Sequence, residues 1–146
     1  MTTDAAHTTE ADSSAWIKEH QVSWELRPMH EMVKEHGLQH TGYALQLFGR
    51  FDPVGHADPA ATAQSIHGRL RLFAIGALEA LPVRLAAHVA PLRAVVRLET
   101  PMVVEVELTI AAFPPDPAHP LPPAEVKRLI EAVGDRLRSL GLKKLG

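Results

Sequence analysis

The sequence predicts an α+β domain in which two successive strand–strand–helix units form a four-stranded antiparallel sheet with both helices packed on one face. Three observations support this prediction. Apolar and polar residues alternate in four short segments, a helical apolar pattern follows each pair of segments, and the second series repeats the order of the first about 63 residues later. The two units would span about residues 22–84 and 85–146.

Size and composition fit one domain. The chain has 146 residues, of which 46% are hydrophobic and 22% charged, and a domain of this length buries a core without cross-links. We expect residues 1–15, which are rich in Thr, Ala, Asp and Ser, to form a disordered tail ahead of a single folded domain over residues 16–146. The net charge of −2 argues against a nucleic-acid partner.

Absent residue patterns exclude further classes. The chain has no cysteine, so disulfides and thiolate chemistry are excluded. It has no run of about 18 apolar residues that could span a bilayer, and its first residues lack the charged start and apolar stretch of a signal peptide. We therefore expect no membrane partner and a cytoplasmic location.

Alternation in residues 22–27 and 41–51 predicts the first two strands, joined by a turn at 34–37. A one-residue shift would move every apolar side chain to the wrong face, so one register is favoured. That register pairs Trp24 with Leu47 and Leu26 with Leu45.

The first helix should begin at Asp58 and Pro59, an N-cap acceptor followed by a proline at the first helical position, and end near Leu81. Two apolar stripes make its buried arc wide. They contain Ile66, Leu70, Phe73, Ala77 and Leu81, and Leu72, Ile75 and Leu78. One side also carries small residues, including Gly68 and Gly76, so we expect a homodimer through helix 59–81 or through a sheet edge.

The second unit has the same order. Residues 92–98 predict a strand with Leu92, Ala94, Val96 and Leu98 facing inward. Residues 102–112 show the clearest alternation in the chain. The last helix should run from about 124 to 140, with Gly141 as its C-cap.

The outer face of the sheet is predicted to carry both signs of charge, from Glu25, Arg27, Glu31, Arg93, Arg97, Glu105 and Glu107. Paired carboxylates can serve as acid and base in glycoside hydrolysis. Here Arg93 and Arg97 should meet Glu105 and Glu107 on the neighbouring strand. Such a lattice normally stabilises and solvates a sheet, so we predict no catalytic residue in it.

Histidine and aspartate occur together in the two loops that precede the helices. His56 lies near Asp52, and His119 near Asp116. Imidazole and carboxylate groups could hold a divalent metal ion or act as a general acid and base. Their spacing matches no metal signature, and aspartates before proline commonly make turns. We therefore predict no metal and no cofactor, and retain these four residues as weak candidates.

The lack of catalytic motifs favours a non-enzymatic domain that binds a partner or a small apolar ligand and acts as a homodimer. Trp24, Tyr43 and Phe73 could line a cleft between sheet and helices, with His56 and His119 at its mouth. The alternatives are a small enzyme or metal-binding protein that uses the two histidine loops, and a structural subunit assembled through sheet edges.

Overall fold

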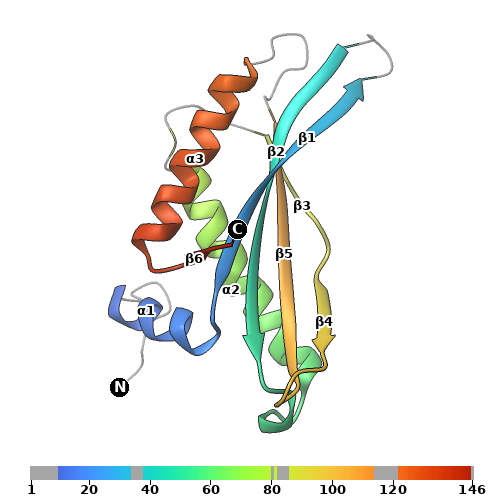
Figure 1. The fold of residues 1–146 in the computed structure, drawn as a ribbon, viewed down its shortest axis with the longest axis vertical. Helices are drawn as coiled ribbons and strands as arrows, with labels where there is room; N and C mark the ends of the chain where they lie inside the picture. The colour runs from blue at the N-terminus through green and yellow to red at the C-terminus, as the bar shows by residue number, and fades with distance from the viewer. Residues whose placement is uncertain (1–9, 34–37, 80, 82–85, 114–121, 146) are drawn as a thin grey trace.

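The computed structural model describes residues 10–33, 38–79, 81, 86–113 and 122–145. The fold is α+β, with a mixed six-stranded sheet and three α-helices in the described residues (Figure 1). In chain order the elements are α1 (Glu10–Glu19), β1 (Ser23–Val33), β2 (Leu38–Phe51), the short 3-10 helix η2 (Pro53–Gly55), α2 (Pro59–Glu79), β3 (Ala86–Val89), β4 (Arg93–Arg97), β5 (Val103–Phe113), α3 (Pro123–Ser139) and β6 (Lys143–Lys144).

The sheet has the order β3-β5-β2-β1-β6, and β4 also pairs with β5. β1 and β2 are antiparallel, as are β2 and β5. In the first hairpin Trp24 lies opposite Leu47, and Leu26 opposite Leu45, which confirms the predicted register. β6 runs parallel to β1, so the sheet is mixed.

The prediction of only four antiparallel strands and two helices was wrong in detail, because α1, β3 and β6 are added. β6 forms because burial of the Leu142 side chain places the C-terminal residues next to β1. The Lys143 amide then donates to the Val22 carbonyl at 3.1 Å, and the Leu145 amide to the Trp24 carbonyl at 2.8 Å.

The expected tail overlaps α1, which already begins at Glu10. Ile17 is buried in the core, and the rings of Trp16 and Phe73 lie 5.8 Å apart. The end of α1 is tied to β2, because His20 Nδ1 donates to the Arg50 carbonyl at 3.0 Å and the Arg50 amide donates to the His20 carbonyl at 2.7 Å. Two docked apolar residues and these bonds fix the helix against the sheet.

Helix α2 begins where predicted and ends at Glu79, two residues before the expected Leu81, and α3 ends at Ser139 with Leu140, not Gly141, as its C-cap. The Ala61 amide donates to the Asp58 side chain at 3.1 Å, so Asp58 caps α2. Gly141, at φ +102°, follows α3 in the left-handed conformation that glycine favours. Both helices contact the sheet and each other. None of the described helices is long and apolar enough to cross a bilayer.

Two apolar stripes are less buried than predicted. Val96 and Leu98 were expected to face the interior, but they are 55% and 89% exposed. Leu92 is also partly exposed, and Leu72, in the second stripe of α2, is 70% exposed. The residues of β4 are exposed because α2 packs over β2 and β5. β4 lies at the edge of the sheet, where α2 does not cover it.

Candidate functional site

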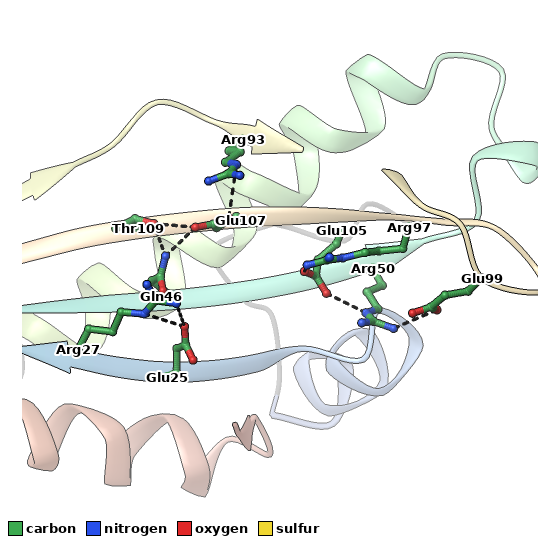
Figure 2. Close-up of polar contacts among 10 residues, drawn as sticks. All are labelled: Glu25, Arg27, Gln46, Arg50, Arg93, Arg97, Glu99, Glu105, Glu107 and Thr109. Carbon is green, nitrogen blue, oxygen red and sulfur yellow. Dashed lines mark hydrogen bonds and ion pairs between the residues drawn. The ribbon is translucent and has the colours of Figure 1, made fainter. Parts of the chain in front are cut away.

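The outer face of the sheet, opposite the helices, carries a group of polar side chains that we call the outer-face cluster (Figure 2). Alternation brings them together, because residues next to core positions on each strand point the other way. The cluster comprises Glu25 and Arg27 from β1, Gln46 and Arg50 from β2, Arg93 and Arg97 from β4, and Glu105, Glu107 and Thr109 from β5.

Glu105 is the charged centre of the cluster. Its side chain is largely buried, and its two carboxylate oxygens accept from Arg50 Nε and from Arg97 Nη2, both at 2.9 Å. Burial alone raises the pKa of Glu105, but the hydrogen bonds and charges of Arg97 and Arg50 outweigh burial and lower the pKa below its ordinary value. Glu105 is therefore ionised at neutral pH, with an arginine on each oxygen.

Gln46 is buried beside this centre, with only 8% of its surface exposed. Its Nε2 donates to Glu107 Oε1 at 2.6 Å and to Thr109 Oγ1 at 3.2 Å. Carboxylate and hydroxyl oxygens accept from the amide nitrogen, so these bonds fix the orientation of the amide. The other amide atom, Oε1, has no hydrogen-bond donor among the described residues. A buried polar atom without a hydrogen-bond partner destabilises the fold by about 1–3 kcal/mol. Gln46 Oε1 therefore needs a donor.

The remaining ion pairs of the cluster lie around Glu105, and two of them are longer than the contacts of Glu105 itself. Arg93 Nε lies 3.9 Å from Glu107, and Arg50 Nη1 lies 3.4 Å from Glu99. Arg27 Nη2 is 3.0 Å from Glu25, and the side chains of Arg27 and Arg93 are mostly exposed. A guanidinium has five N–H donors, and one carboxylate contact leaves several of them facing solvent.

Two hollows of about 440 Å³ each adjoin the cluster. The outer hollow lies over the strands, and the end hollow lies between α1, β1 and the C-terminal residues. Arg50, Glu105 and Leu145 line both, so the two hollows adjoin each other at these side chains. Six cationic and three acidic side chains line them, an excess of three positive charges in a chain whose net charge is −2. Phe48 and Leu145 add apolar surface to the outer hollow.

Comparison with protein-family models, with curated proteins and with solved structures finds no match to this chain.

The three aromatic candidates have different neighbours. Trp24 is buried in the main core, where its indole packs against Gly134 of α3. Phe73 contacts Trp16, and the Arg69 guanidinium lies over both rings. Tyr43 packs near Ala112, away from the main core cluster. None of the three lines the outer hollow or the end hollow.

The first histidine loop is described, and its polar groups have structural partners. Asp52 accepts from the Val54 amide at 2.9 Å and caps η2, as Asp58 caps α2. His56 is exposed, packs its ring edge-on to Phe51 and shares a 3.3 Å hydrogen bond with Thr62. Within the described ranges, no group of three or more His, Asp or Glu could hold a metal ion. Asp116 and His119 lie outside those ranges.

The sequence predicted the contacts of Arg93 and Arg97 with Glu107 and Glu105, which the structure confirms. It missed Gln46 and Arg50. Both lie at outward positions of β2. The predicted register depends only on the inward, apolar positions of that strand. Their alternation was a usable signal, but their partners depend on the pairing of β2 with β5.

Proposed function

We propose that this chain is a non-enzymatic binding domain that acts as a homodimer and holds a small organic anion in the outer hollow. The observation that carries the proposal is Gln46, a buried side chain in the wall of a hollow, among arginines, whose carbonyl oxygen has no donor within the part of the chain that the structure describes. Because this oxygen is itself buried, a hydroxyl or N–H group of the ligand, directly or through one ordered water, would supply that donor once a neighbouring side chain moves aside.

The ligand is proposed to be anionic because four arginines and three glutamates line the outer hollow, and the adjoining end hollow adds two lysines, Lys18 and Lys143. The exposed guanidiniums of Arg27 and Arg93 can bind a carboxylate or phosphate in bidentate geometry. Phe48 and Leu145 would contact the apolar part of the same molecule. This differs from the apolar ligand expected from sequence, because the hollow lies on the polar face of the sheet.

A binding role is favoured over catalysis by the state of Glu105. A general acid must carry a proton near neutral pH, and a general base needs a free oxygen. The pKa of Glu105 is lowered, and arginines engage both of its oxygens. Glu105 is therefore suited to hold Arg50 and Arg97 in place for an anion. The alternative enzyme at the His56 loop has less support, because Asp52 and Asp58 already cap helices.

Internal duplication is part of the proposal. Gln46 and Thr109 are separated by the predicted offset of 63 residues and lie directly opposite each other in β2 and β5. Equivalent residues of two related units meet in this way at a pseudo-two-fold axis. At the same offset β1 falls on residues 86–96, which contain β3 and the first part of β4, and both of these strands pair with β5 as β1 pairs with β2.

The experiment is a calorimetric titration of the purified protein with probes that combine a negative charge with a hydroxyl: malate, citrate and glycerol 3-phosphate. We expect at least one probe to bind, and Arg93→Gln to weaken it about tenfold or more, the loss of one charge-assisted contact. Arg128→Gln is the matched control, because Arg128 is equally exposed but lies on α3 in an i,i+3 ion pair. Absence of binding by every probe, or equal weakening by both substitutions, would overturn the proposed ligand class.

A further inference from the structure

We infer that the ligand carries two anionic groups, and that Lys18 and Lys143 in the end hollow bind the second of them. The inference rests on the proposed function, because the first group is the one that the outer hollow binds. It narrows the ligand from an organic anion to an organic dianion that reaches from the outer hollow into the end hollow.

The positive charge that carboxylates leave unbalanced lies in the end hollow. In the outer hollow, each of the four arginines of the lining forms an ion pair with a glutamate of the same lining. The end hollow is lined by Glu105, whose two oxygens are both engaged by arginines. Lys18 and Lys143 line it as well, and within the described residues neither of them forms an ion pair. Two lysines without a carboxylate partner therefore border one hollow, which favours an anion there.

The two lysines come from distant parts of the sequence, and backbone hydrogen bonds join the segments that carry them. Lys18 lies in the last turn of α1, and its carbonyl accepts from the Gln21 amide at 3.2 Å. The Val22 amide donates to the Ile17 carbonyl at 3.0 Å, and the Val22 carbonyl accepts from the Lys143 amide at 3.1 Å. The end of α1, the start of β1 and β6 therefore form one hydrogen-bonded unit. Because both lysine backbones are fixed in it, a bound anion orders only their side chains.

The junction between the hollows suits the middle of a dianion. Arg50, Glu105 and Leu145 line both hollows. Leu145 is 39% exposed, so it offers apolar surface to a carbon chain that joins the two anionic groups. Two arginines balance the charge of Glu105, so this carboxylate does not oppose an anion on either side of it. The hydroxyl or N–H group proposed to meet Gln46 belongs at the end of the ligand in the outer hollow.

The experiment compares matched probes by calorimetric titration of the full chain: malate with 2-hydroxybutyrate, and 2-hydroxyglutarate with 2-hydroxyvalerate. In each pair a methyl group replaces the second carboxylate, while the chain length and the hydroxyl stay the same. We expect at least one dicarboxylate to bind about tenfold or more tightly than its monocarboxylate, the effect of an added charge-assisted contact. The preference should shrink as the salt concentration rises, because both lysines are exposed.

Substitutions assign the preference to the end hollow. Lys18→Gln combined with Lys143→Gln should lower the affinity for the dicarboxylate to about that for the monocarboxylate. Lys127→Gln combined with Lys144→Gln is the matched control, because it removes the same charge from exposed lysines that line neither hollow. Arg93→Gln should weaken both members of a pair alike, because Arg93 lines only the outer hollow. Circular dichroism checks that each variant is folded.

A preference for the dicarboxylate that is lost only in the Lys18 and Lys143 variant supports the inference. Equal affinity within each pair, or equal weakening by this variant and its control, overturns the second anion site and leaves the proposed site in the outer hollow in place. Binding of two monocarboxylates per chain also overturns the inference, because the hollows would then hold separate molecules. No binding by these probes or by those of the proposed function overturns both.

Discussion

The indole of Trp24 rests directly on the backbone of Gly134: a Cβ at position 134 would lie 2.5 Å from Cη2 of the ring. Trp24 belongs to β1 and Gly134 to the middle of α3, so this contact joins the sheet to the last helix. Glycine in a helix interior costs about 1 kcal/mol relative to alanine. Here the missing side chain allows the largest buried residue of the core to fit beneath the helix.

Gly134→Ala should therefore lower the free energy of unfolding by about 1–2 kcal/mol, because overpacking outweighs the gain in helix propensity. Urea denaturation measures the change. Gly68→Ala is the matched control: it lies in α2, where an added Cβ meets no atom within 4 Å, and it should raise the free energy of unfolding by about 0.5–1 kcal/mol. Equal effects at the two positions would contradict the packing argument.

Glu105→Gln should lower the free energy of unfolding by about 1–2 kcal/mol at neutral pH, because it weakens two charge-assisted hydrogen bonds that solvent screens only in part. The pKa of Glu105 is lowered in the folded state, so its stabilisation is present above the ordinary value of 4.5 and is lost as pH falls through the folded value. Urea denaturation across the acid range should show wild type and variant converging as pH falls. Glu25→Gln, at an exposed ion pair, should change stability by less than about 0.5 kcal/mol.

His67 should make the fold less stable in mild acid. Burial and the nearby positive charge of Arg71 lower the pKa of His67, and its Nε2 has no hydrogen-bond partner in the described residues. Below the ordinary value of 6.5 the unfolded chain takes up a proton that the folded state resists, so stability falls with pH in that range. Melting temperatures from neutral to mildly acidic pH should therefore fall less steeply for His67→Leu than for wild type. The exposed His56→Asn should follow the wild-type curve; a His67→Leu curve parallel to wild type would be inconsistent with this account.

The sequence determined those parts of the fold in which local pattern and burial agree. Alternation left one register in which Trp24 and Leu45 both reach the core, and an aspartate before a proline marked the start of α2. The exposure of Val96 could not be predicted in this way. Alternation shows which face a side chain occupies, but whether a helix covers that face depends on how far α2 reaches across the sheet.

The contacts of the candidate site could also be predicted only in part from the sequence. Opposite charges on adjacent strands predicted the pairing of Arg97 with Glu105, because both lie in one hairpin. The roles of Gln46 and Arg50 required the pairing of β2 with β5, two strands joined through a long intervening segment. Long-range pairing of that kind is fixed by tertiary packing, which periodicity within a short segment does not encode.

The C-terminal residues after α3 should contribute to stability well beyond the two residues of β6. Leu142 is only 2% exposed and packs in the main core, and its amide donates to the Leu137 carbonyl at 3.2 Å. Truncating it removes buried methyl groups and leaves a cavity, so Leu142→Ala should lower the free energy of unfolding by about 2–4 kcal/mol.

Leu72→Ala is the control for this prediction, because it makes the same chemical change at a leucine that is 70% exposed, and it should change the free energy of unfolding by less than about 0.5 kcal/mol. Chemical denaturation of both variants at one protein concentration separates burial from the general effect of losing a leucine. Comparable small effects at both positions would mean that the C-terminal residues do not dock on β1. Loss of that docking would also remove Leu145 from the walls of both hollows, since the Leu145 amide is held by the Trp24 carbonyl.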